Sequence, residues 1–245
     1  MIELKNIYFQ AAGRDILHDV SLRIDDGRFV VITGPNGSGK TTLARLIMGI
    51  EQPSSGQIIF NGQDVTNLGI TERAKLGISF AFQQPVRFKG LTVTDIISLA
   101  ASAGSDKKLS TAEVCDYLSE VGLCARDYVN REVDSKLSGG ELKRIEIATL
   151  LARGEQTKLA IFDEPEAGID LWSFNNLIDV FNNLRQQSAA SIIVISHQER
   201  ILSIADELVL LSAGQIASQG ERETILPQLI NIDYKYSCKG GQRND

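Results

Sequence analysis

Residues 34–41 read Gly-Pro-Asn-Gly-Ser-Gly-Lys-Thr, directly after the apolar run 29–33 and before the helical pattern Leu43, Leu46, Ile47. This order predicts a strand, a glycine-rich turn and a helix. Glycines in such a turn let consecutive backbone N–H groups converge on a phosphate, and the helix directs its positive end at the same anion. The segment therefore predicts an α/β unit built around a phosphate-binding loop.

The residues at the end of this loop indicate a nucleoside triphosphate with its metal. Lys40 can neutralise the β- and γ-phosphate oxygens, and Thr41 offers a hydroxyl to Mg²⁺. We expect the nucleotide to be bound by Gly34, Pro35, Asn36, Gly37, Ser38, Gly39, Lys40, Thr41 and Thr42.

A pair of carboxylates follows the apolar run 159–162. In a parallel sheet this strand end lies beside the phosphate loop, so Asp163 can hold Mg²⁺, directly or through water. Glu164 is then placed to orient and deprotonate an attacking water. Such a pair alone also suits a solvated strand end, but behind a phosphate loop the pattern favours hydrolysis.

The segment 137–141, Leu-Ser-Gly-Gly-Glu, opens another helical pattern. Ser138 and Glu141 fit a capping box, which explains these two residues. It does not explain Gly139 and Gly140, which cost helix stability but let the backbone approach an anion closely. These residues alone do not decide whether the segment only caps the helix or also binds an anion.

Together these motifs resemble the ATP-binding cassette (ABC) ATPases over nearly the whole chain. Residues 34–41 resemble the Walker A loop, 159–164 the Walker B strand with its catalytic glutamate, and 137–141 the family signature. Gln83 matches the Q-loop glutamine that senses metal and water, Asp170 in the segment 167–170 the D-loop, and His197 the switch histidine.

The resemblance implies a role for each of these residues. Glu164, His197, Gln83 and Lys40 would be catalytic, Thr41, Gln83 and Asp163 would hold Mg²⁺, and Ser138, Gly139, Gly140 and Asp170 would join the loop in binding ATP. In this family two subunits enclose the nucleotide head to tail, so one chain contributes two half-sites. We therefore expect hydrolysis of ATP to ADP and phosphate to need a second ABC ATPase subunit.

The pattern of elements predicts one P-loop NTPase domain of the α/β class over residues 1–232. We expect a mostly parallel core sheet formed by 1–88 and 137–232, an antiparallel β subdomain, and an inserted helical subdomain at 89–136. Ser110 and Glu113 predict a capping box within this insert. Residues 233–245 read as a polar C-terminal tail.

Composition limits which partners the chain is expected to bind and in which compartment it is expected to work. The net charge is −6 and no block of basic residues occurs, so we expect no nucleic-acid partner. The longest apolar runs are only of strand length, so we expect no signal peptide and no membrane span. Cys115, Cys124 and Cys238 are scattered without metal-ligand spacing, which fits a reducing cytoplasm.

Two roles fit the motifs. The segments 81–86, Lys143-Arg144 with Glu146, and 197–202 are similar to the SufC-type ATPases, which drive iron–sulfur cluster assembly on a SufB/SufD-like scaffold. Pro165 is instead usual in transporters. The alternative is the ATP-binding subunit of an ABC membrane transporter, which would dock onto a permease. A module that binds ATP without turnover is disfavoured by Glu164 and His197.

One departure from the family concerns the base. Many members place an aromatic residue under the adenine, and here that place falls near Ala11. Tyr8 and Phe9, slightly upstream, read as strand residues. We therefore expect phosphate contacts to dominate the affinity, and the sequence leaves open how strictly adenine is preferred.

Overall fold

The fold comes from a computed structural model, which describes residues 1–102, 109–187 and 189–237. Strands and helices alternate along most of it, as the sequence predicts. The elements are β1 (Ile2–Ala11), β2 (Arg14–Ile24), β3 (Phe29–Thr33), α1 (Lys40–Met48), β4 (Ser55–Phe60), β5 (Gln63–Asp64), α2 (Ile70–Lys75), β6 (Ile78–Ala81), β7 (Phe88–Thr92), α3 (Val93–Ser102), α4 (Thr111–Glu120), α5 (Ala125–Tyr128), β8 (Glu132–Val133), α6 (Gly139–Ala152), β9 (Leu159–Asp163), α7 (Leu171–Gln187), β10 (Ser191–Ile195), α8 (Glu199–Leu202), β11 (Glu207–Ser212), β12 (Gln215–Glu221) and α9 (Arg222–Ser237).

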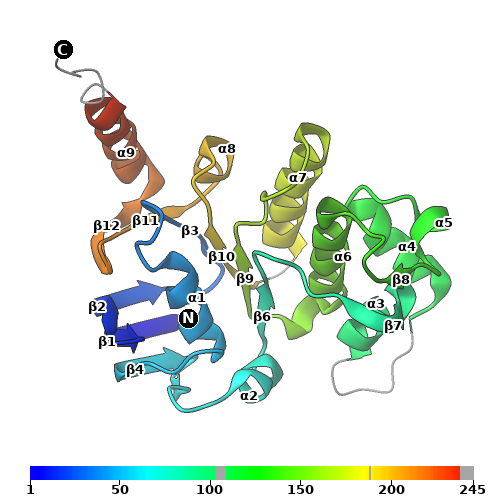
Figure 1. Ribbon diagram of the computed structural model, residues 1–245, viewed down its shortest axis with the longest axis horizontal. Helices are drawn as coiled ribbons and strands as arrows, with labels where there is room; N and C mark the ends of the chain where they lie inside the picture. The colour runs from blue at the N-terminus through cyan, green and yellow to red at the C-terminus, as the bar shows by residue number, and fades with distance from the viewer. Residues whose placement is uncertain (103–108, 188, 238–245) are drawn as a thin grey trace.

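The central sheet has the strand order β12-β11-β3-β10-β9-β6 (Figure 1). Every neighbouring pair from β11 to β6 is parallel, and β12 runs antiparallel to β11. All five residues of β3 are buried, and they alternate between two cores. Phe29 and Val31 face one core, while Val30 and Ile32 face the other. This explains the continuous apolar run, because helices or a second sheet cover both faces.

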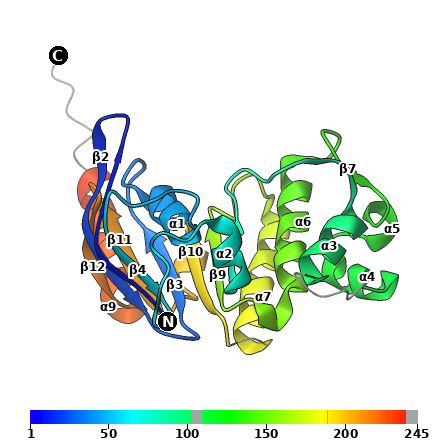
Figure 2. The same ribbon diagram turned by 90° about the horizontal axis from the view of Figure 1, so that it is seen from below.

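The second core lies between the central sheet and an antiparallel sheet of order β2-β1-β4-β5. Helix α1 contributes Leu43, Ala44, Leu46 and Ile47 to this core, so the helix after the phosphate loop is fixed between two sheets. Figure 2 shows this side of the molecule, with β1, β2 and β4 at one end and the helices α3, α4 and α6 at the other. The expected antiparallel subdomain is present.

The segment expected as a helical insert carries α3, α4 and α5, and Ser110 and Glu113 form the predicted capping box. It also carries a short antiparallel pair, β7 with β8, which the sequence did not indicate. Helices α3 and α4 both pack against α6, so the helical layer continues past residue 136 into the signature helix.

Helix α9 is an element that the sequence pattern missed. It contains Pro227, which normally argues against a helix, and its apolar residues show little periodicity. The helix continues to Ser237, so the expected tail at 233–245 begins inside it. Residues 238–245, with Cys238, lie outside the described part of the chain.

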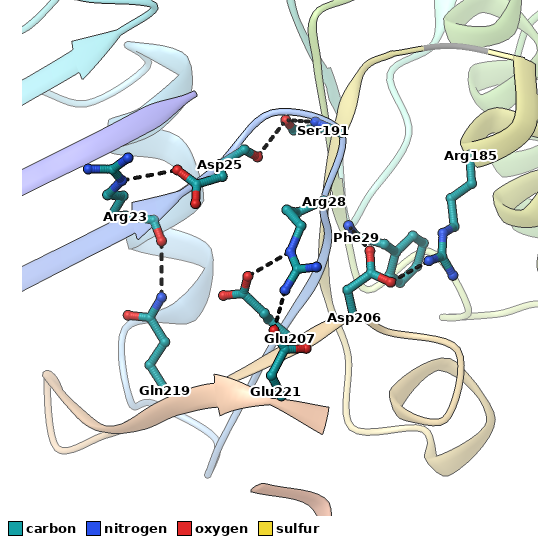
Figure 3. A network of polar contacts seen from close by, with 11 residues as sticks. Arg23, Asp25, Arg28, Phe29, Arg185, Ser191, Asp206, Glu207, Gln219 and Glu221 are labelled. Atoms are coloured by element: carbon teal, nitrogen blue, oxygen red, sulfur yellow. Dashed lines mark hydrogen bonds and ion pairs between the residues drawn. The ribbon is translucent and has the colours of Figure 1, made fainter. Parts of the chain in front are cut away.

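A polar network joins the amino ends of β3 and β11 to the carboxyl end of β12 (Figure 3). The phosphate loop follows the other end of β3. Arg28, just before β3, donates to Glu207 of β11 at 2.8 Å and to Glu221 of β12 at 2.5 Å. Asp206 accepts from the backbone N–H of Phe29 at 2.8 Å and from Arg185 of α7. These contacts tie neighbouring strands together at one end of the sheet. The functional site lies at the other end, where β3, β9 and β10 finish.

Candidate active site

The carboxyl ends of β3, β9 and β10 border a cleft of about 810 Å³. This is the edge at which a parallel sheet is expected to bind its ligand. The cleft brings together most of the predicted site, although the residues come from distant parts of the sequence. Its lining is Ala11, Arg14, Asp15, Ile16, Asn36, Gly37, Gly39, Lys40, Thr41, Thr42, Gln83, Glu164, His197, Ala213 and Gly214.

The phosphate loop needs glycine at its first position. Gly34 has φ +139°, and a Cβ there would lie 1.9 Å from the carbonyl oxygen of Leu211. Lys40 is buried, and its Nζ donates to the carbonyl oxygens of Gly34 at 2.8 Å and Pro35 at 2.9 Å. Burial lowers the pKa of Lys40, opposed by the charges of Glu164 and Asp163. The backbone carbonyls of the loop therefore hold the Lys40 ammonium in place at the N-terminus of α1.

The two carboxylates after β9 have different surroundings. Asp163 is buried, and its Oδ1 accepts from Thr41 Oγ1 at 3.1 Å. Burial raises the pKa of Asp163, while the Thr41 hydrogen bond opposes that change. Glu164 is half-buried in the cleft wall, and its Oε2 accepts from Gln83 Nε2 at 2.7 Å. The structure therefore pairs Thr41 with Asp163 and Gln83 with Glu164.

Glu164 also has an unusual backbone. Its φ is +44°, in the left-handed region that residues with a side chain seldom adopt. The conformation is held by a hydrogen bond from its own N–H to the carbonyl oxygen of Ile195, 3.0 Å away. Strained backbone of this kind clusters at functional sites, where positioning the side chain is worth a loss of folding stability.

The donor set near Thr41 and Asp163 fits Mg²⁺. A hydroxyl, a carboxylate and the amide oxygen of Gln83 are hard oxygen ligands, and Mg²⁺ is commonly held by one or two protein oxygens together with substrate phosphates. Within the described residues, no group of three or more His, Cys, Asp or Glu side chains is arranged to bind a metal.

His197 is exposed on the cleft wall, directly after β10. The preceding residue, Ser196, donates to Glu166 Oε1 at 2.5 Å and accepts from the backbone N–H of Gln198 at 3.0 Å. Burial raises the pKa of Glu166. The switch loop is therefore joined to the segment that follows Glu164. The sequence did not single out Glu166, whose partner Ser196 lies 30 residues away.

The signature residues do not line the cleft. Ser138, Gly139 and Gly140 form the start of α6, where Ser138 and Glu141 make the predicted capping box. Tyr128 Oη donates to Glu141, and this bond, ahead of the others, lowers the pKa of Glu141 to about 2. The signature instead lies beside the D-loop, because a Cβ at Gly140 would be 3.1 Å from the carbonyl oxygen of Gly168. Asp170 belongs to this second region.

Ala11, which stands where many members of the family place an aromatic residue, lines the cleft. Tyr8 and Phe9 are strand residues that do not line the cleft. Arg14, Asp15 and Ile16 do line it, and the sequence did not identify them. They follow the tight turn between β1 and β2, and only the fold shows that this hairpin reaches the phosphate loop.

Comparison with known proteins agrees with this geometry. The family model described as ABC transporter matches residues 17–167. The chain belongs to this family. It is an ABC ATPase, with ATP as the nucleotide of the family.

Several relatives cover almost the whole chain. An uncharacterized ABC transporter ATP-binding protein of Methanocaldococcus jannaschii, MJ0035, is 36% identical over 97% of this chain and 94% of its own length. A probable ATP-dependent transporter, ycf16, of Pyropia yezoensis is 35% identical over 90% and 91%. The sulfate/thiosulfate import ATP-binding protein CysA of a Synechocystis species is 33% identical over 91% of this ABC ATPase, which spans only 61% of CysA.

Solved structures confirm the fold. A dimeric structure of the ATP-binding cassette MJ0796, in a post-hydrolysis state with ADP and Pi, superimposes with a TM-score of 0.80 at 24% identity. The match covers 91% of this ABC ATPase and 99% of that chain. No helix in the described parts, 1–102, 109–187 and 189–237, is long and apolar enough to cross a membrane.

Proposed function

We propose that this chain is the ATP-binding subunit of an ABC transporter and hydrolyses Mg²⁺-bound ATP in the cytoplasm to drive it. The observation that carries this proposal is the convergence of Lys40, Gln83, Glu164 and His197 on one cleft. The relatives support the transporter role, because those named above are described as transporters, ABC transporter proteins or import ATP-binding proteins. The substrate is not assigned, and the partner would be a membrane permease.

The residues around the cleft suggest how hydrolysis proceeds. The loop N–H groups and Lys40 bind the phosphates and stabilise the charge that develops on them. Thr41, Asp163 and Gln83 would hold Mg²⁺, which supplies further neutralisation of phosphate charge. Glu164 takes the proton of the attacking water, Gln83 orients Glu164 through their 2.7 Å bond, and His197 contacts the γ-phosphate.

A second subunit completes the site in this proposal. The glycines of the signature are exposed or half-buried at the start of a 14-residue helix, outside the cleft of their own chain. Their backbone N–H groups and the helix dipole would bind the nucleotide held by another chain, arranged head to tail. ATP would then favour the closed pair, because only that pair offers both sets of contacts.

A SufC-type role is the second candidate, supported by the resemblance of Lys143-Arg144 with Glu146 to the SufC pattern. In the structure Lys143 and Glu146 contact the backbone of Phe82. In this case the partner would be a SufB/SufD-like scaffold, and ATP would drive iron–sulfur cluster assembly.

The Glu164→Gln variant tests the catalytic proposal. The amide keeps the size of the side chain but cannot act as a base, so we expect unchanged ATP binding and hydrolysis at least ~100-fold slower. Phosphate release and equilibrium binding of ATP to wild type and variant measure the two effects. Turnover close to that of wild type would remove Glu164 from its role.

The same variant distinguishes the partners. A tagged Glu164→Gln chain, trapped with ATP in its own cells, should be recovered with the subunit that it drives, and mass spectrometry identifies that subunit. A polytopic membrane protein supports the transporter role. A β-rich scaffold without membrane spans, carrying candidate cluster ligands, would contradict it in favour of the SufC-type role.

A further inference from the structure

Lys143 is a fully buried lysine in the second turn of α6. Its Nζ donates to the carbonyl oxygen of Phe82 and lies 3.5 Å from that of Gln83 and 3.4 Å from that of Asp163. One ammonium group thus joins three segments: the signature helix, the Q-loop and the end of β9. Burying such a charge is costly, and the carbonyl contacts offset this cost only while the three segments stay together.

Glu146, one turn further along α6, holds the same loop through the backbone N–H of Phe82. Its Oε1 accepts from the backbone N–H of Phe82 at 2.9 Å. Its Oε2 is buried, lies 3.7 Å from Lys143 Nζ, and has no hydrogen-bond donor within reach among the described residues. The two side chains therefore bind both the N–H and the C=O of Phe82, the residue before Gln83.

These contacts link the two halves of the proposed mechanism through helix α6. Helix α6 begins with the signature glycines, and Lys143 follows Gly140 by three residues. Gln83, held through Phe82, donates to Glu164 in the cleft. A small displacement of α6 must therefore either carry the backbone at Phe82 with it or break hydrogen bonds of a buried charge, which is costly.

We propose that Lys143 and Glu146 are positioning residues that couple the signature helix to Gln83 of the same chain. Contact between α6 and the nucleotide of a second subunit moves Gln83 relative to Glu164, so each chain senses closure at one half-site and adjusts the other. This inference rests on the proposed function. It adds two residues that act through Gln83 without touching the nucleotide.

A double-mutant cycle tests this coupling on the full chain, purified with the subunits with which it is recovered. We expect Lys143→Met to lower kcat at least ~10-fold while KM for ATP changes less than ~3-fold. In a Gln83→Ala background the same substitution should lower kcat less than ~2-fold, because the residue through which it acts is already absent. Equal losses of kcat in both backgrounds would overturn the coupling.

Arg153 provides the matched control. It follows α6 at the opposite end, is partly buried, and donates to the carbonyl oxygen of Ala74 at 2.9 Å rather than to the backbone of the Q-loop. Arg153→Met should lower the melting temperature while leaving kcat within ~2-fold of wild type. If Arg153→Met and Lys143→Met lower kcat in proportion to their loss of stability, Lys143 is only structural.

Glu146 supplies a pair of variants in case Lys143→Met does not fold. Glu146→Gln keeps an acceptor for the Phe82 N–H and should retain kcat within ~3-fold, whereas Glu146→Leu should reduce it at least ~10-fold. Equal kcat in these two variants contradicts the proposal. The proposed function is tested separately: its catalytic part fails if the wild type does not hydrolyse ATP or if Glu164→Gln turns over close to wild type, and its transporter part fails if the recovered partner has no membrane spans.

Discussion

Arg73 shows how a single buried cation can hold the phosphate-binding helix in place. It is fully buried and donates to the carbonyl oxygens of Leu46 at 2.6 Å and Ile47 at 2.8 Å, at the end of α1. Further bonds reach the carbonyls of Thr66 and Leu68. Burial lowers the pKa of Arg73 to about 10. The positive charge complements the negative end of the helix whose other end carries Lys40.

We expect Arg73→Met to lower the free energy of unfolding by about 3 kcal/mol, because several buried carbonyls lose their donor at once. Urea unfolding of wild type and variant measures this difference. The control is Arg23→Met, since Arg23 pairs with Asp25 where both side chains are more than half exposed. That change should cost less than ~1 kcal/mol. Similar losses in both variants would show that the buried guanidinium adds nothing specific.

Residues that a local motif requires at a fixed position can be predicted from the sequence. Gly34, Lys40 and Glu164 were identified because a phosphate loop and a strand-ending carboxylate need those residue types at those places. Lys143 and Arg73 were not identified as buried, because a charged residue in a helical pattern normally reads as a solvated one. Only the positions of their carbonyl partners, 5 to 61 residues away in sequence, show their role.

At the scale of elements, the start of α6 depends on a side chain from α5. Glu141 closes the capping box with Ser138, and Tyr128 Oη donates to the same carboxylate. Arg131 lies over the Tyr128 ring, with 5.4 Å between its guanidinium carbon and the ring centroid. The signature backbone is therefore held in position by a cluster that tolerates little change in the charge of Glu141.

The depressed pKa of Glu141 gives this cluster a defined pH dependence. Its value falls from 4.5 to about 2 in the folded chain, chiefly through the Tyr128 bond. A carboxyl with a lowered folded pKa contributes stability that is fully present above its unfolded value and is lost as pH falls toward the folded value. The contribution is therefore complete above pH 4.5 and disappears toward pH 2.

We expect Tyr128→Phe to be less stable than wild type at pH 6, with a difference that shrinks as pH falls from 4.5 to 2. Urea unfolding of both proteins across this range isolates the effect from other carboxyls, which the two share. A stability difference that is constant with pH would mean that Tyr128 acts through packing alone.

Elements with strong periodicity or capping residues were predictable, and those without either were not. The capping boxes at Ser110 and Ser138 correctly marked the starts of α4 and α6. The pair β7 and β8 escaped notice because β8 is only two residues long and its partner carries exposed side chains. Helix α9 escaped because Pro227 interrupts a weakly periodic pattern.

At the scale of the whole molecule, the two predicted half-sites lie in separate places on the chain. The cleft contains the phosphate loop, Gln83, Glu164 and His197, and the signature lies outside it. The sequence could predict that both motifs exist, since each needs particular residues at fixed spacing. Their separation in one chain was implied only by the family resemblance, because it depends on how α6 packs against the helical insert.

Gly139→Asp tests whether the signature contacts a second chain. A Cβ at Gly139 would meet no atom within 4 Å, and an acidic residue suits the first turn of a helix, so the chain should fold with unchanged stability. A carboxylate placed against a γ-phosphate should nevertheless abolish ATP-dependent pairing in the Glu164→Gln background. Sedimentation with and without ATP measures this pairing, and Gly139→Ala is the size control. Pairing that persists in Gly139→Asp would mean that this helix end does not meet nucleotide.

The left-handed backbone of Glu164 has a consequence for engineering. A residue with a side chain at φ +44° costs on the order of 1 kcal/mol relative to glycine, so Glu164→Gly should make the chain more stable. A library ranked by heat resistance alone would therefore enrich chains that have lost the carboxylate. Under the proposed mechanism the chain keeps its catalytic base at the expense of stability, so any effort to stabilise this ATPase should measure turnover alongside melting temperature.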